Sequence, residues 1–169
     1  EEGADFQMVL FDEITNEIVI PNGTMGERHT NPEKWNLRLE NRDTGAKIDP
    51  RLSVFDQREN VTIVKLPYFG DEEHEGVIER AIPTITVQTA DGPVKVTTVY
   101  DLILANYGID RGIGGEVATS YTDDTPYTPT WQEKITGVKA EIAIATAREF
   151  ADNAEKTKGR SMIIMGGGI

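Results

Sequence analysis

The sequence predicts an α+β fold, in which an antiparallel β-rich N-terminal half is followed by helices and the start of an α/β unit. In residues 1–97, short apolar stretches alternate with turn residues, as in strands joined by hairpins. From residue 98 the apolar residues recur at helical spacing. The chain closes with a helical stretch, an apolar run and three glycines, the order of helix, strand and turn in α/β proteins. We expect one compact piece with two regions, residues 1–97 and 98–169.

Five stretches of the first region have the pattern of strands. They are FQMVLFD (6–12), NEIVIPNG (16–23), WNLRLEN (35–41), NVTIVKLP (60–67) and TITVQTADGPVKVTT (84–98). The last stretch predicts a complete hairpin, with Ile85 and Val87 on one strand, Val94 and Val96 on the return, and the turn between them. The N-terminal half should therefore be an antiparallel β region.

Two shorter helices are predicted in the second region. In TVYDLILANYG, Thr98 can cap the first turn and Gly108 ends the helix. Its expected apolar face consists of Val99, Leu102, Ile103 and Tyr107. In TPTWQEKITG, Thr128 is the expected cap, Pro129 takes the first helical position and Gly137 is the stop.

The longest helix should be KAEIAIATAREFADNAEK. Its apolar stripe consists of Ala140, Ala143, Ile144, Ala147, Phe150, Ala151 and Ala154. The small alanines predict a helix that lies close against a sheet. After Gly159, residues 161–165 should form a strand.

Composition excludes several classes of function. The 169 residues can bury a sizeable core, but they include no cysteine, which excludes a thiolate nucleophile, a disulfide framework and an iron–sulfur cluster held by this chain alone. The formal net charge of −12 comes from scattered acidic residues and disfavours a nucleic-acid partner. No apolar run approaches the roughly 20 residues of a membrane span, so we expect no direct membrane insertion.

Candidate sites are few. Gly166, Gly167 and Gly168 could let backbone amides approach a pyrophosphate, although glycines after a strand also serve as plain turns. The loop RGIGGE (111–116) matches no phosphate-binding motif, and a flexible loop between helices is the favoured interpretation. DEEHE (71–75) could hold a divalent ion but is more typical of a solvated loop. We predict no catalytic constellation and no metal site, and interpret Asp123-Asp124 as a turn.

The residue order of four stretches indicates more than composition and candidate sites do. They are VIPNGTMGERHTNPEKWNL (19–37), YDLILANYGIDRGIGGE (100–116), TDDTPYTPTWQEKITGV (122–138) and AREFADNAEKTKGRSMIIMGGGI (147–169). Together they resemble the alpha subunit of the respiratory, membrane-bound nitrate reductases, which are molybdopterin oxidoreductases similar to dimethyl sulfoxide reductase. The resemblance spans nearly the whole chain.

The resemblance implies a parent enzyme that reduces nitrate to nitrite at a molybdenum held by two molybdopterin guanine dinucleotides. It also implies a 4Fe-4S cluster, an iron–sulfur beta subunit, a membrane cytochrome b gamma subunit and a peripheral place on the cytoplasmic side of the membrane. Gly166, Gly167 and Gly168, and less directly Ser161, would neighbour a dinucleotide. The family's cluster motif and molybdenum ligand have no counterpart in this sequence, so the isolated chain should bind neither cofactor.

The order of the motifs implies an internal fragment of such a subunit, because in that family the chain continues beyond the glycine turn. The alternative is an independent acidic α+β module that binds a partner without catalysis. A long reading frame beyond Ile169 would favour the first hypothesis, and a stop codon or linker there would favour the second.

Overall fold

The computed structural model describes residues 9–22, 38–67 and 77–164. The chain divides into two compact units, Glu1–Val54 and Phe55–Ile169. The described residues contain antiparallel sheets and three helices, which confirms the predicted α+β class. Residues on both sides of position 97 lie in the second unit.

The first unit contains two short antiparallel strand pairs. β1 (Leu10–Asp12) pairs with β2 (Glu17–Val19), and β3 (Pro21–Asn22) pairs with β4 (Arg38–Asn41). The carboxylate of Asp12 organises the first turn, because it accepts hydrogen bonds from the backbone of Ile14 and Thr15 and, across the unit, from the backbone of Asp49 at 2.9 Å. The apolar core of this unit comes from Val19, Ile48 and Val54.

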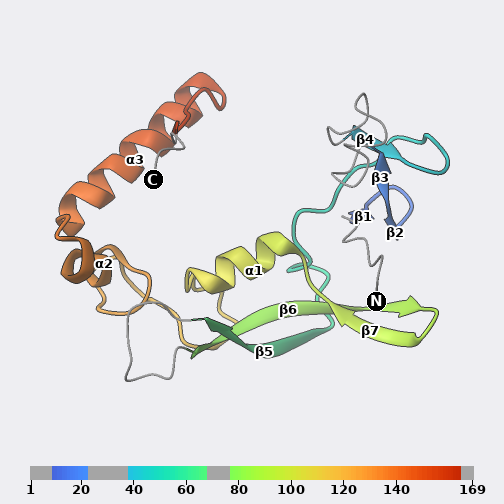
Figure 1. Ribbon diagram of the computed structural model, residues 1–169, viewed down its shortest axis with the longest axis horizontal. Helices are drawn as coiled ribbons and strands as arrows, with labels where there is room; N and C mark the ends of the chain where they lie inside the picture. Colours follow the sequence, from blue (N-terminus) through green and yellow to red (C-terminus); the bar gives the residue numbers. More distant parts are fainter. Residues whose placement is uncertain (1–8, 23–37, 68–76, 165–169) are drawn as a thin grey trace, which may run out of the picture. The chain divides into compact units, whose positions relative to one another are not determined.

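The second unit is built on a three-stranded antiparallel sheet in the order β5-β6-β7 (Figure 1). Its strands are β5 (Asn60–Pro67), β6 (Val77–Thr89) and β7 (Gly92–Val96). Ile85 lies opposite Val96 and Val87 opposite Val94, so the predicted hairpin is present, with these residues on its two strands as predicted. β6 is the central strand, and α1 (Val99–Asn106) packs against it. Buried apolar residues of this unit are Ile78, Ala81, Ile82, Ile85 and Ala105.

The two shorter helices begin at their predicted caps, and the second also ends at its predicted stop, while α1 ends at Tyr107, one residue before the predicted Gly108. Thr98 caps α1 by accepting a hydrogen bond from the backbone of Asp101. Thr128 caps α2 (Pro129–Thr136) and Gly137 closes it in the left-handed conformation. The third helix, α3 (Ala140–Thr157), contacts α2. Local signals alone were sufficient to predict these three helices.

The predicted apolar face of α1 is wrong. Val99, Ile103 and Tyr107 are exposed, while Asp101 and Ala105 are the buried residues of the helix. The helix turns this side inward because Arg111 neutralises the carboxylate of Asp101, which can then be buried without an unpaired charge.

Two expectations for the C-terminal stretch also differ from the structure. The main contact of α3 among the described elements is with α2, whereas α1 is the helix with a main contact to the sheet, through β6. Residues 161–164 do not form the predicted strand. A strand requires a hydrogen-bonded neighbour, and no described strand pairs with these residues. Met165, the last residue of that prediction, lies outside the described residues.

Candidate functional site

The residues predicted to lie near a dinucleotide are only partly described. Gly166, Gly167 and Gly168 lie outside the described residues, as do the DEEHE stretch and His29. Ser161 is described, and its hydroxyl donates to the carbonyl of Phe150 at 3.1 Å and accepts from the side-chain amide of Asn153 at 2.8 Å. These bonds hold the chain that follows α3 against the helix.

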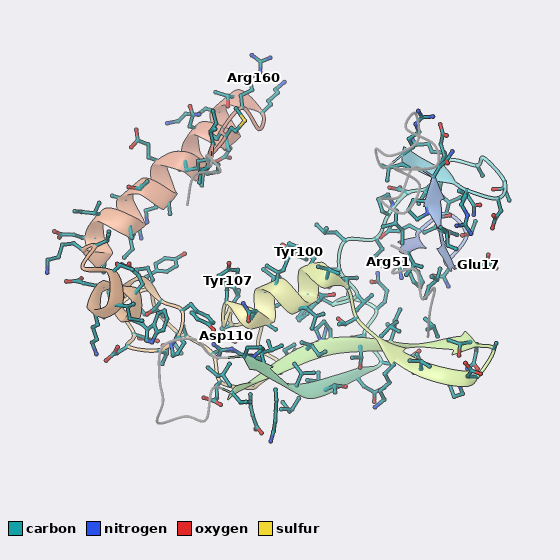
Figure 2. All side chains as sticks on the ribbon, in the orientation of Figure 1. Glu17, Arg51, Tyr100, Tyr107, Asp110 and Arg160 are labelled. Carbon is teal, nitrogen blue, oxygen red and sulfur yellow. The ribbon has the colours of Figure 1, made fainter. Side chains whose placement is uncertain are left out.

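A shallow depression of about 420 Å³ surrounds Ser161. Its lining includes Glu149, Phe150, Asn153, Arg160 and Met162. Arg160 lies beyond the C-terminal end of α3 (Figure 2), so a cation and an apolar side chain border the same hollow.

The RGIGGE loop is fastened to the sheet rather than free between two helices. Gly112, Gly114 and Gly115 all have positive φ angles. Gly115 forms a bridge with Arg80 of β6, and the backbone N–H of the next residue, Glu116, donates to the carbonyl of Glu79 at 3.0 Å. Gly115 thus permits close approach of this loop to a strand.

Arg80 is the largest fully buried side chain beneath this loop, with 2% of its surface exposed. Its Nη2 donates to the carbonyl of Pro126 at 2.7 Å. A Cβ atom on Gly108 would lie 2.9 Å from the same nitrogen, so glycine is needed where the chain leaves α1. Burial lowers the pKa of Arg80, while the carboxylate of Glu116 and the phenolic group of Tyr127 favour its charged form.

A second buried charge lies in α1. Asp101 has no exposed side-chain surface, and its carboxylate accepts from Arg111 Nη1 at 2.5 Å and from the hydroxyl of Thr98 at 2.7 Å. The guanidinium of Arg111 stacks on the ring of Phe55 at 4.1 Å from the centroid. Burial of Asp101 was not predicted, although the sequence has an arginine ten residues after this carboxylate.

These buried charges attach the long connection between α1 and α2 to β6 and to α1. Asp123 acts within this connection: the hydroxyl of Thr119 and the backbone N–H groups of Thr119 and Ser120 donate to its carboxylate, and these bonds lower its pKa. Asp124 forms an ion pair with Lys134 of α2. The pair of aspartates is thus part of a turn, as predicted, and each carboxylate stabilises local structure.

Within residues 9–22, 38–67 and 77–164, no three His, Asp or Glu side chains are grouped so that they could hold a metal ion. No helix in these ranges is long and apolar enough to cross a membrane. The buried charged side chains described above instead fix loops of the second unit.

A groove of about 410 Å³ lies between the α2 region and α3. The first side contributes Tyr127, Pro129 and Gln132, together with Tyr121. α3 contributes residues of its predicted stripe, among them Ala143, Ile144, Ala147 and Ala151. Tyr127 also makes edge contacts with Tyr107 and Trp131, at centroid distances of 6.2 and 5.1 Å. The walls of the groove are therefore mostly aromatic and small apolar groups.

Comparison with known proteins identifies what this scaffold resembles. No family model matches the chain. Over 160 residues, which cover 95% of the chain, it is 48% identical to the nitrate reductase alpha chain of Bacillus subtilis. The chain is similar to nitrate reductase alpha chains. It is also 44% identical to the respiratory nitrate reductase 1 alpha chain of Escherichia coli over all of its length, and 45% identical to the respiratory alpha chain of a Bradyrhizobium species over 96% of its length.

The similarity covers a small part of each nitrate reductase alpha chain. The chain spans 13%, 14% and 15% of the length of these three relatives. Because the identity extends over nearly the whole of the present chain, the relatives confirm the resemblance to nitrate reductase alpha subunits that the four sequence stretches indicated.

Proposed function

We propose that the chain is a segment of the catalytic alpha subunit of a respiratory nitrate reductase. The single observation that carries this proposal is identity of 44–48% to four alpha chains over at least 90% of the present chain. The parent enzyme then transfers two electrons to nitrate and releases nitrite. By resemblance, electrons reach the alpha subunit through an iron–sulfur beta subunit and a cytochrome b gamma subunit at the cytoplasmic face of the membrane.

The proposed cofactor of the parent is molybdenum with two molybdopterin guanine dinucleotides, beside a 4Fe-4S cluster. The described residues do not fit either group as ligands, because they include no cysteine and no grouped metal-binding side chains. The three glycines proposed to neighbour a dinucleotide lie outside the described residues. We therefore derive no chemical step from this segment and propose that it supports the catalytic subunit structurally.

Buried polar contacts support the scaffold role. Arg80 and the Asp101–Arg111 pair hold the 108–127 connection against β6 and α1. Such groups are costly to bury unless they are paired, and here their partners come from the loop that they hold. The segment would thereby present α2 and α3 in a fixed relation to that loop.

The test begins with the gene. We expect the reading frame to continue through Ile169 and to encode a chain with the cysteine motif and the metal ligand that this segment lacks. A stop codon directly after Ile169, or a flexible linker followed by an unrelated domain, would overturn the proposal in favour of an independent acidic module.

Activity is tested in the full-length subunit. The complete alpha chain, produced with its partner subunits in a strain that lacks its own nitrate reductases, should restore reduction of nitrate with a viologen donor. A matched subunit with residues 55–164 deleted should give no activity. If the complete enzyme bound molybdenum but reduced no nitrate, the assignment of substrate would be wrong.

A further inference from the structure

Two successive residues attach the start of α2 to one end of the β5–β6 ladder. Arg80 of β6 donates to the carbonyl of Pro126 at 2.7 Å, and the hydroxyl of Tyr127 donates to the carbonyl of Pro67, the last residue of β5, at 3.1 Å. In the strand register Arg80 lies opposite Val64, three residues before Pro67. The two bonds therefore reach paired strands at the same end of the sheet, and α2 begins two residues after Tyr127.

The ring of Tyr127 extends this attachment to α1 and α2. It makes edge contacts with Tyr107, the C-cap of α1 that Figure 2 labels, and with Trp131 in the first turn of α2. Edge-to-face pairs have a preferred geometry, so they restrict direction as well as distance. Neither α2 nor α3 has a buried residue, and the main contact of each among the described elements is with the other helix. The contacts of Tyr127 are therefore the chief link between this helical pair and the sheet.

Glu133 of α2 fixes the start of α3. The N-cap residue of α3, Lys139, makes no side-chain cap hydrogen bond. Instead, the carboxylate of Glu133 accepts from the backbone N–H of Ala140 at 2.9 Å and from Nζ of Lys139 at 2.6 Å. A carboxylate at this position satisfies a free N–H group of the first turn and interacts favourably with the helix dipole. The cap that α3 lacks in its own sequence is thus supplied by α2.

We infer that Tyr127 is a positioning residue, which sets the direction of α2 from the end of the sheet and, through Glu133, the direction of α3. The path runs from Pro67 of β5 through the phenol of Tyr127 to Trp131, and from Glu133 to the first turn of α3. This inference rests on the proposed scaffold role and deepens it, because it names the side chains through which the segment presents its C-terminal helices.

The experiment measures amide hydrogen exchange by mass spectrometry in the complete alpha subunit, produced with its partner subunits. Tyr127→Leu removes both the ring contacts and the hydrogen bond to Pro67, whereas Tyr127→Phe removes the hydrogen bond and keeps the ring. Glu133→Ala removes the cap of α3 and leaves Tyr127 in place. Tyr100→Leu is the matched control, because Tyr100 lies on α1 and is 39% exposed (Figure 2), and the same atoms are removed there.

We expect Tyr127→Leu to raise the exchange rate by about tenfold in α2 and in the first turn of α3, and to leave the β6–β7 hairpin unchanged. Tyr127→Phe should raise the rate less in the same two places, because the rings still meet. Glu133→Ala should raise it only in the first turn of α3, and Tyr100→Leu in neither place.

Three results would overturn the inference. An equal increase in the hairpin and in α2 would show a general loss of stability. Unchanged exchange in α2 of the Tyr127→Leu subunit would show that other contacts position this helix. An increase in α2 of the Glu133→Ala subunit as large as that of Tyr127→Leu would contradict the order of the path. If Tyr127→Leu prevents assembly of the subunit, Tyr127→Phe decides the question, since its increase must be confined to α2 and the start of α3.

Nitrate turnover is measured on the unmodified subunit and on the same variants, so the two ideas are separated. An active enzyme in which Tyr127→Leu leaves exchange in α2 unchanged refutes the role of Tyr127 and leaves the proposed function intact. A complete subunit that shows the selective increase but reduces no nitrate refutes the proposed substrate and supports the role of Tyr127.

Discussion

Replacing Gly115 with alanine should detach the RGIGGE loop from the sheet. A Cβ at this position would lie 2.5 Å from the backbone nitrogen of Ala81, and a backbone atom cannot rotate away. The φ angle of +82° adds roughly 1–2 kcal/mol for any L-residue. Separation would also remove the two hydrogen bonds between Glu116 and Glu79, each worth roughly 1 kcal/mol. We expect the free energy of unfolding to fall by about 3–4 kcal/mol.

Gly112→Ala is the matched control. Gly112 lies in the same loop with a φ angle of +69°, but a Cβ atom added there would meet nothing within 4 Å. This variant should lose only the conformational contribution, roughly 1–2 kcal/mol. Urea unfolding followed by far-UV circular dichroism measures both variants against the parent chain. Equal losses for the two variants would show that close approach to β6 does not hold the loop, and the reasoning would fail.

Three further results are expected. Arg80→Lys should lower the free energy of unfolding by roughly 2 kcal/mol in urea titrations, because a lysine cannot reproduce the buried bond to Pro126. Hydrogen bonds to the carboxylate of Asp12, above all the one from the backbone of Asp49, lower its pKa. The carboxylate therefore stabilises the folded chain above about pH 4, and this contribution is lost as the pH falls through the lowered pKa. The melting temperature of the Asp12→Asn variant should therefore fall less as the pH is lowered than the melting temperature of the parent chain does. Thr128→Ala should cost about 1 kcal/mol in thermal melts by removing the cap of α2.

The parts of the fold that the sequence predicted well depend on neighbours within a few residues. The cap by Thr128, the proline after it and the glycine at 137 act inside one short helix, so α2 could be placed without tertiary information. The hairpin of β6 and β7 is equally local, because a two-residue connection leaves its strands few alternative registers.

The buried charges could not be predicted in the same way. The pattern of α1 favoured Val99 and Ile103 as the inner face, since burial of a carboxylate is normally unfavourable. The opposite face of α1 is buried because Arg111 pairs with Asp101. Arg111 lies beyond the end of the helix and reaches Asp101 only after the chain has folded back. Burial of Arg80 could not be predicted for a related reason, because its partner carbonyl belongs to Pro126, 46 residues away.

Residues 161–164 are a different case, because their apolar composition predicts a buried strand while the structure leaves Met162, Ile163 and Ile164 exposed. A strand is a property of two segments, and an apolar run can be recognised as half of a ladder before the other half is known. Within the described residues the run has no pairing strand and stays exposed, although its sequence is that of a strand covered on both faces. Three consecutive large apolar residues in water would be an aggregation hazard. Apolar composition alone therefore could not predict the structure of this run, because a strand forms only where a second segment pairs with it.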